Sequence, residues 1–241
     1  MKRLLGSFAI TLLLLSNAFA QGNREMQNLD EWTTYYYLNP EPDKIVLALK
    51  EITARGYFEN DNVQAPLSGF FSEVFLANPE RINTWVEPYI GIPKRHILYS
   101  ALWASNSTQS RVALERMAKA VSPEEAKKIL SLLASPPPTI ESMSINSPSA
   151  LDYLWGRFMA SGSAAPVNRI IDQMKLTDSK GNVEAMLIGG AAQWSVSAND
   201  RQHKKVLEIV KARTVTADSQ TKKLLNEILA GIDAAKTKNA R

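Results

Sequence analysis

The side chains that could carry out chemistry are few and far apart in this sequence. His96 and His203 are the two histidines of the chain, which contains no cysteine. The lack of cysteine excludes thiolate nucleophiles, thiolate metal ligands and disulfides, and two histidines this far apart lack the close spacing of zinc-ligand motifs. We therefore predict no metal site and expect His96 to be a partly buried polar residue instead of a general base.

Motifs for nucleophilic catalysis and phosphate binding are also missing. Ser219 and Lys222 have the Ser-x-x-Lys spacing of penicillin-binding enzymes, but the other motifs of that family do not follow in order, so we interpret Ser219 as a helix N-cap. Gly189-Gly190 lies in a helical pattern without the Lys-Ser/Thr of a P-loop. Glu124 and Glu125 fall in the predicted first turn of a helix, where carboxylates favour the positive end of the helix dipole. The sequence predicts no catalytic residue and no cofactor.

Residues 1–20 have the three parts of a secretory signal peptide. Lys2 and Arg3 supply a positive start, an apolar run extends from Leu4 to Leu15, and Ala18-Phe19-Ala20 has the small-x-small pattern of a cleavage site. We expect cleavage after Ala20 and a periplasmic or secreted mature protein, with a retained N-terminal anchor as the alternative. No later stretch has the roughly 20 apolar residues of a membrane helix, so we expect no integral membrane span after signal removal.

The charge balance does not favour nucleic-acid binding. The chain has 28 basic and 24 acidic residues, and removal of Lys2 and Arg3 leaves 26 basic residues against 24 acidic ones. The basic surplus lies in residues 236–241, which we interpret as a flexible, solvated tail. Nucleic-acid binding would need a basic patch with aromatic side chains among it, and the aromatic cluster near Tyr36 is not basic.

The segment from Leu151 to Leu176 is the clearest copy of a helical hairpin. Apolar residues at three- and four-residue spacings define a first helix. Ser161-Gly162-Ser163 interrupts this helix, because glycine is unfavourable inside a helix and favourable at its C-terminal cap. Pro166 begins a second helix, whose apolar stripe includes Ile170 and Met174. The segment therefore predicts two antiparallel helices.

Other segments share the junction of this hairpin. Two large apolar residues, an alanine and a small polar residue end the first helix in Phe75-Leu76-Ala77-Asn78, Leu102-Trp103-Ala104-Ser105 and Phe158-Met159-Ala160-Ser161. A hairpin cannot bury its apolar face alone, so stacked hairpins would share one continuous core. This pattern resembles HEAT-like α-solenoid repeats, and the segments PLSGFFSEVFLANPERI and LWGRFMASG are similar to exported proteins of Gram-negative bacteria without an assigned activity. The resemblance implies a right-handed array of stacked antiparallel hairpins and brings no activity with it.

We therefore predict an all-α fold of about ten helices, in a single domain over residues 21–241. No segment alternates long enough to indicate a strand. Pro136, Pro137 and Pro138 exclude helix and open a polar loop over residues 135–148, which we interpret as a loop within one array because the hairpin pattern occurs on both sides. Gly189-Gly190-Ala191-Ala192 predicts close approach of a neighbouring helix, or a kink.

An aromatic segment, residues 28–41, precedes the first long helix. Trp32 is followed by three consecutive tyrosines, which cannot share one face of a helix or a strand. One interpretation is a cap that covers the open end of the helical array. The other is an exposed docking surface, because tyrosine and tryptophan bury well while keeping a polar tip in water. We assign this docking surface to Trp32, Tyr35, Tyr36, Tyr37, Phe70 and Phe71.

These patterns favour a binding or scaffolding protein over an enzyme. Helical arrays present broad surfaces suited to peptides and proteins, and motifs that would indicate turnover are missing. We expect an exported protein that acts through protein or peptide contacts without a cofactor. Two alternatives are a carrier of an apolar ligand, with a closed cavity lined by residues such as Phe75, Trp103 and Phe158, and an exported hydrolase with a carboxylate site assembled by the fold.

Overall fold

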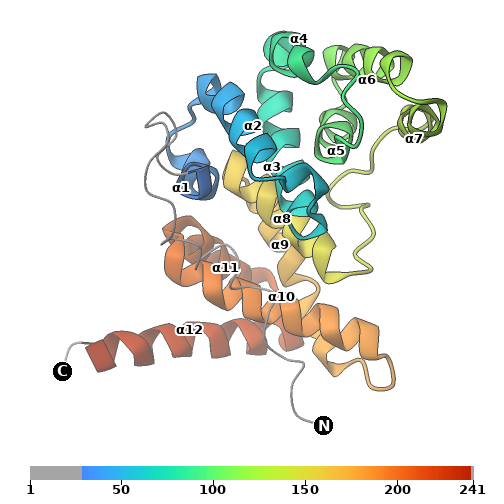
Figure 1. The fold of residues 1–241 in the computed structure, drawn as a ribbon. Helices are drawn as coiled ribbons and strands as arrows, with labels where there is room; N and C mark the ends of the chain where they lie inside the picture. Colours follow the sequence, from blue (N-terminus) through green and yellow to red (C-terminus); the bar gives the residue numbers. More distant parts are fainter. Residues whose placement is uncertain (1–28, 240–241) are drawn as a thin grey trace.

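The chain folds into helices, as the computed structural model shows (Figure 1). The structure describes the backbone of residues 29–239 and the side chains of residues 29–231. This part of the chain contains twelve α-helices, six 3-10 helices and no strand, which confirms the all-α prediction. The helix count exceeds the prediction because the aromatic segment itself contains a helix, α1 (Leu29–Tyr35). The predicted signal peptide, residues 1–20, lies outside the described residues.

The helices follow one another through short connections. After α1 come α2 (Ile45–Ala54), α3 (Asp61–Ala77), α4 (Ile82–Val86), α5 (His96–Ser105), α6 (Thr108–Ala120) and α7 (Pro123–Leu133). The second half contains α8 (Pro148–Ser161), α9 (Ala164–Ile171), α10 (Val183–Gln202), α11 (Lys204–Thr216) and α12 (Ser219–Asn239). The 3-10 helices are η1 (Tyr36–Leu38), η2 (Pro42–Lys44), η3 (Tyr57–Glu59), η4 (Pro79–Arg81), η5 (Glu87–Tyr89) and η6 (Met174–Asp178). Because α12 continues to Asn239, most of the predicted tail over residues 236–241 is helical.

Turn and cap residues set many of these boundaries. Gly56 and Gly162 follow α2 and α8 with left-handed backbone φ angles of 67° and 62°, and Gly162 lies in the predicted break after the first helix of its hairpin. Helix α3 begins at Asp61, before Pro66, because the side chain of Asn60 caps it by accepting a first-turn backbone N–H.

The buried apolar side chains form two clusters, whereas the stacked-hairpin interpretation predicted one continuous core. The first cluster comes from the helices of residues 29–133 together with Ala160, and its fully buried members include Phe71 and Phe75. The second comes from α8 to α12 and includes Phe158 and Val196. The partly buried Met159 packs against both clusters.

Helices α3 and α8 cross so closely that their backbones touch. A β-carbon on Gly69 of α3 would lie 2.0 Å from the carbonyl oxygen of Tyr153. A β-carbon on Gly156 of α8 would lie 2.0 Å from the carbonyl oxygen of Pro66. Neither position has room for any side chain, so only glycine allows this crossing.

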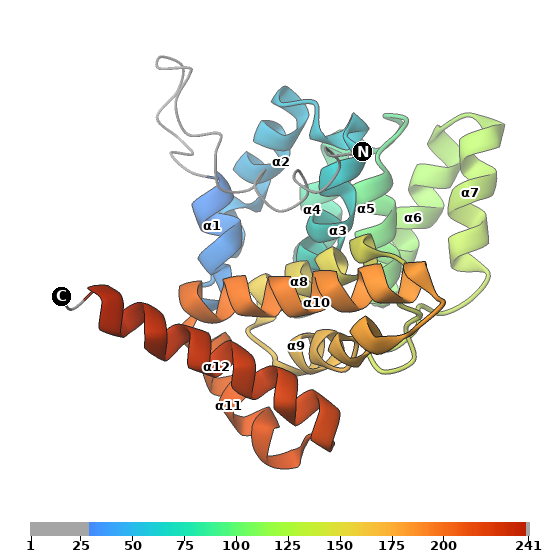
Figure 2. The same ribbon diagram turned by 90° about the horizontal axis from the view of Figure 1, so that it is seen from below.

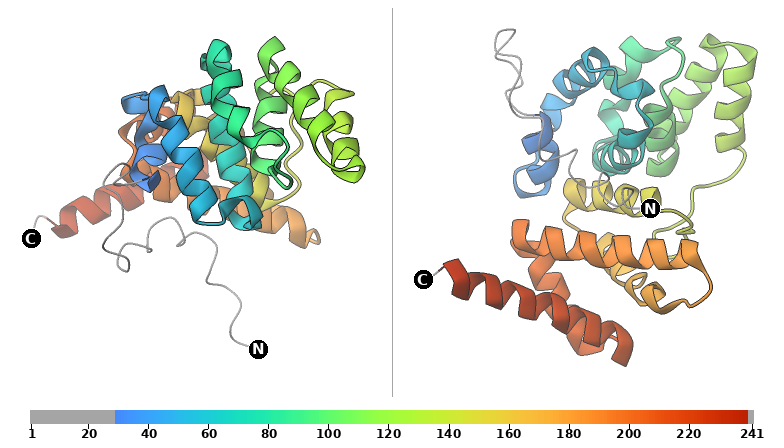
Figure 3. Two further views of the ribbon diagram at one scale, coloured as in Figure 1. Left: turned by 45° about the horizontal axis from the view of Figure 1, so that its top comes forward. Right: turned by 60° about the horizontal axis from the view of Figure 1, so that its bottom comes forward.

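The crossing places α8 in the middle of the molecule. In Figure 3 (right), α8 lies between the helices of the first cluster and α10. Beside the two glycines, Glu73 of α3 pairs with Arg157 of α8. Backbone and charged groups therefore occupy the place where one continuous core would need apolar side chains, which explains the two clusters. Since α4 to α7 separate α3 from α8 along the chain, this contact does not join neighbouring hairpins. The regular right-handed stack and the single domain stay predictions.

Residues 134–147 connect the two clusters without a helix, as the triple proline predicted. The indole nitrogen of Trp103 on α5 donates a hydrogen bond to the carbonyl oxygen of Ser135, at 2.9 Å. The guanidinium of Arg169 on α9 donates to the carbonyl oxygen of Met143, also at 2.9 Å. The loop is thus fixed to the first cluster at one end and to the second at the other.

Candidate interaction surface

The aromatic segment lies between the two clusters, and half of it belongs to the first. Trp32 and Tyr36 are 9% and 5% exposed. Each packs edge-on against Phe70 of α3, with ring centroids 5.3 Å apart in both pairs. The two rings also meet each other at 5.2 Å. These contacts make Trp32 and Tyr36 part of the core that surrounds α3.

Tyr35 and Tyr37 contact His203, where α10 meets α11. The Tyr37 hydroxyl lies 3.2 Å from His203 Nδ1, and the Tyr35 ring centroid lies 5.2 Å from that of His203. The ring of Tyr37 also packs on Phe158 of α8 at 5.0 Å, and the Gln202 amide donates to the Tyr35 hydroxyl at 3.2 Å. Both tyrosines remain partly exposed. The segment therefore connects α3 of the first cluster to α8 and α10 of the second.

The predicted docking residues divide into a buried and a partly exposed group. The rings of Trp32, Tyr36, Phe70 and Phe71 lie in the core, so this part of the predicted surface is not presented by the folded chain. A partner could reach these rings only if the segment detached from α3. A binding role for the six residues stays a prediction, and within it Tyr35 and Tyr37 are the accessible members.

Helix α10 runs across the front of Figure 2, and a row of exposed apolar residues lies along it. Its large members, Val183, Met186, Leu187 and Trp194, are 68%, 43%, 57% and 54% exposed. Their spacing, with that of the exposed Gly190, puts them on one face of the helix. We call these five residues the α10 stripe.

The opposite face of α10 is apolar as well. Ile188, Ala192 and Val196 on that face are 5%, 0% and 0% exposed and belong to the second cluster. A helix that is apolar on both faces is normally covered on both. The stripe thus leaves apolar surface open to solvent, as expected where another chain binds.

The paired glycines of α10 have different surroundings. A β-carbon on Gly189 would lie 2.3 Å from the backbone nitrogen of Thr177 in η6, which confirms the predicted close approach at this position. A β-carbon on Gly190 would have no described atom within 4 Å. Of these two glycines, only Gly189 is required by packing within the described chain.

Sequence patterns pointed to the glycines of α10 but not to its exposed stripe. A usable signal exists, because Val183, Leu187 and Trp194 fall on the side of the helix opposite to Ile188 and Val196. A surface helix normally has one apolar and one polar face. Apolar residues on both faces therefore indicate either full burial or an uncovered binding surface.

Two ionisable side chains are buried near the end of α10. Asp200 is 3% exposed, and neither of its carboxylate oxygens has a hydrogen-bond partner among the described residues. Burial raises the pKa of this carboxyl to about 6. His203 is 1% exposed, and burial lowers the pKa of its imidazole to about 4. Because both groups are shielded from solvent, we interpret them as a source of pH-dependent stability and not as an acid–base pair.

Glu125 forms another buried polar centre, at the start of α7. It lies in the first turn of α7, as predicted, but its carboxylate also contacts the segment before α5. The backbone N–H of Lys94 donates to Glu125 Oε1 at 2.5 Å, and the hydroxyl of Tyr99 donates to the same oxygen at 3.0 Å. Lys94 has a left-handed φ of 61°. The carboxylate thus holds an unfavourable loop conformation in place, which is a structural function.

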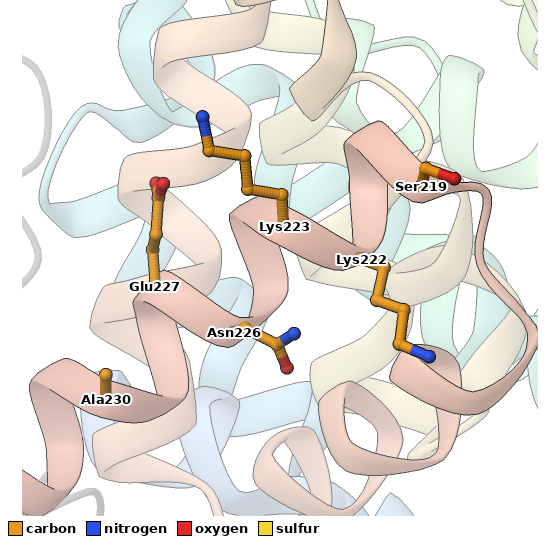
Figure 4. Close-up of a pocket in the computed structure, with 6 residues that line it drawn as sticks. All are labelled: Ser219, Lys222, Lys223, Asn226, Glu227 and Ala230. Atoms are coloured by element: carbon orange, nitrogen blue, oxygen red, sulfur yellow. The ribbon is translucent and has the colours of Figure 1, made fainter.

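A hollow on α12 is open to solvent and lined by residues of this helix alone (Figure 4). Ser219 and Lys222, which have the Ser-x-x-Lys spacing, both line it, together with Lys223 and Glu227. Figure 4 shows these side chains extending to different sides of the helix instead of converging on one point. Asp218, and not Ser219 as predicted, caps α12 by accepting the backbone N–H of Thr221 at 2.9 Å. Ser219 and Lys222 therefore do not come together as a catalytic serine–lysine pair in this hollow.

The described residues provide neither a cluster of metal ligands nor a helix that could span a membrane. No three histidine or carboxylate side chains in this part of the chain lie close enough together to hold a metal ion. None of the described helices has both the length and the apolar character needed to cross a membrane.

Comparison with known proteins assigns the chain to no family. No protein-family model, no curated protein and no solved structure matches it.

Proposed function

We propose that this chain is an exported, non-enzymatic binding or scaffolding protein, and that its partner contacts the α10 stripe. The observation that carries the proposal is the exposure of four large apolar side chains, between 43% and 68%, on one face of one helix. Soluble proteins rarely leave large contiguous apolar patches uncovered, and such patches mark interaction sites. Tryptophan and methionine, both present in the stripe, are enriched in protein interfaces.

A hydrolytic function has weaker support. It requires a carboxyl group with a raised pKa in an accessible cleft. Asp200 has a raised pKa, but its buried side chain is in register with Ala192 and Val196 of the second cluster. The pKa of Asp152 on α8 is also raised to about 6 by loss of hydration, yet Asp152 is exposed, and contact with water weakens such a shift. Binding is therefore the better-supported function.

Site-specific photocrosslinking in cells of the source organism tests the proposal. A photoreactive phenylalanine analogue at Met186 places the probe within the stripe. The same analogue at Leu130 on α7, which is 54% exposed, is the matched control because it is also an exposed apolar position on a helix. We expect a crosslinked protein product from position 186 and none from position 130. Equal products from both positions, or none from either, would contradict a binding surface on α10.

Export, the other part of the proposal, is supported by the signal-peptide pattern of residues 1–20. Mass spectrometry of the protein isolated from its own cells tests it together with cell fractionation. We expect a mature chain that begins at Gln21 and is found in the periplasm or the medium. A chain that retains residues 1–20 would contradict cleavage after Ala20.

A further inference from the structure

The spacing of the α10 stripe is complementary to itself. Leu187 lies three residues before Gly190 and Trp194 four residues after it, while Val183 and the exposed Ala198 lie seven before and eight after. In two antiparallel copies of α10 that cross beside Gly190, with the twofold axis between positions 190 and 191, Leu187 of each chain lies opposite Trp194 of the other. Val183 lies opposite Ala198 in the same way. A twofold axis requires such a self-complementary surface.

Gly190 allows two helices to approach each other closely at the centre of this pattern. Glycine is unfavourable inside a helix relative to alanine, and no described atom lies within 4 Å of a β-carbon at this position. The neighbouring Gly189 has a clear packing reason, since the backbone of Thr177 fills the space beside it. A second chain packed over position 190 provides a comparable reason for Gly190.

The charges on α10 favour an antiparallel pair over a parallel one. The helix has an acidic residue, Glu184, in its first turn and a basic residue, Arg201, in its last turn. Two antiparallel copies bring the acidic end of one helix towards the basic end of the other, and they also oppose the helix dipoles. A parallel pair would bring like charges together. A helix that lies on an anionic membrane has basic residues along the edges of its apolar face, whereas residues 183–198 of α10 contain no basic residue.

We infer that this chain forms a homodimer through the α10 stripe, with two antiparallel α10 helices crossing beside Gly190. The inference rests on the proposed function and names a second copy of the chain as the partner. From Val183 to Ala198 the contact is about 22 Å long, at 1.5 Å per residue. Such a contact is at the small end of the range for specific interfaces. We therefore expect a dimer that dissociates at micromolar concentrations.

Analytical ultracentrifugation of the mature chain, from low micromolar to several hundred micromolar, tests the dimer. We expect a monomer–dimer equilibrium that is weakened at least about tenfold by Leu187→Glu or Trp194→Glu. Leu130→Glu is the matched control, because Leu130 is 54% exposed and Leu187 is 57% exposed. It should leave association unchanged. All three variants should keep the helicity and melting temperature of the wild-type monomer, since each position is more than half exposed. A wild-type chain that stays monomeric, or a dimer unaffected by both stripe variants, would overturn the inference.

Thiol crosslinking tests the antiparallel arrangement at positions other than Leu187 and Trp194. Because the chain has no cysteine, Val183→Cys and Ala198→Cys each introduce a single thiol. We expect disulfide-linked dimers when the two variants are mixed, and far fewer from either variant alone. Val215→Cys, at an 80% exposed position on α11, should give no linked dimer. Efficient linkage of each variant with itself would indicate a parallel pair and overturn the arrangement.

The outcomes separate this inference from the proposed function. A monomeric chain whose position 186 crosslinks to a different protein would exclude the homodimer and leave the binding function in place. A monomer that sediments with anionic phosphatidylglycerol vesicles through Leu187 and Trp194 would also exclude the homodimer, in favour of a membrane surface. A monomer without any crosslinked product would contradict both proposals.

Discussion

Glu73 of α3 and Arg157 of α8 form an ion pair within the contact that joins the two clusters. Arg157 Nε donates to Glu73 Oε1 at 2.5 Å, and the two side chains are only 13% and 14% exposed. Removing one charge of a buried pair leaves the other without compensation, which typically costs about 3–5 kcal/mol. We expect Glu73→Gln to lower the free energy of unfolding by about 3 kcal/mol in urea denaturation.

A more exposed ion pair provides the control for this prediction. Arg116 and Glu87 are 2.7 Å apart, and their side chains are 39% and 58% exposed. Pairs of this kind contribute at most about 1 kcal/mol, so Glu87→Gln should have a small effect. Replacing both Glu73 and Arg157 by apolar residues should recover part of the stability lost in Glu73→Gln. Equal losses from Glu73→Gln and Glu87→Gln would show that burial of the pair is not the cause.

The glycine crossing beside this pair predicts strong sensitivity to a single methyl group. Gly69→Ala and Gly156→Ala each place a β-carbon 2.0 Å from a backbone oxygen of the facing helix. The helices must then separate, and we expect a loss of about 3 kcal/mol or more in the free energy of unfolding. Gly190→Ala is the matched control. It should stabilise the monomer by up to about 1 kcal/mol, because alanine is the better helix former and the site is open. A loss at position 190 as large as at positions 69 and 156 would contradict this account.

The parts of the fold that sequence predicts well depend on residues a few positions apart. The glycine stop at Gly162, the helix-free loop at Pro136 to Pro138 and the apolar stripe of α9 all follow from local backbone preferences or helical periodicity. The close approach of α3 and α8 at Gly69 and Gly156 has no such signal, because a glycine has no side chain that would reveal its neighbour and the facing helix is distant in sequence. The division of the core into two clusters depends on this contact and was therefore not predicted.

For the two candidate surfaces, the aromatic segment and the α10 stripe, the sequence likewise predicts local features but not which side chains are buried. Three consecutive tyrosines indicate that the segment has neighbours on more than one side, and Tyr36 and Tyr37 do pack in different directions. Which of these rings is buried depends on Phe70 and Phe158, which lie far along the chain. For α10 the sequence contains both apolar faces, but only the packing of Ile188 in the second cluster shows which face is left open.

The aromatic segment should contribute to stability unevenly. Tyr36 is 5% exposed and packs on Phe70, so we expect Tyr36→Ala to lower the free energy of unfolding by about 3 kcal/mol. Tyr37→Ala should have a similar effect, because the Tyr37 ring packs against Phe158 and His203. Tyr35→Ala should cost about 1 kcal/mol, since its hydroxyl contact with Gln202 is exposed. Thermal and urea unfolding of the three variants measure this order. Equal, small losses would mean that the segment is not part of the core.

Asp200 and His203 should make stability depend on pH in opposite directions. The pKa of Asp200 is raised from 3.8 to about 6 in the folded chain. As pH falls from 6 towards 4, the folded state takes up a proton that the unfolded state does not yet bind, so folding gains stability. The pKa of His203 is lowered from 6.5 to about 4. Over nearly the same range the unfolded state takes up the proton first, so folding loses stability. Each effect amounts to about 3 kcal/mol, and in the wild-type chain the two largely cancel.

Single substitutions should therefore reveal a pH dependence that the wild-type chain hides. The measured quantity is the difference between the free energies of unfolding at pH 7 and pH 4, in which effects of a substitution that do not depend on pH cancel. Asp200→Asn removes the gain, so it should lose about 3 kcal/mol more than wild type on acidification. His203→Gln removes the loss, so it should retain about 3 kcal/mol more than wild type at pH 4. The double variant should return to a pH dependence close to that of the wild-type chain. If both single variants follow the wild-type pH dependence, the two buried groups do not hold the shifted pKa values that their burial implies.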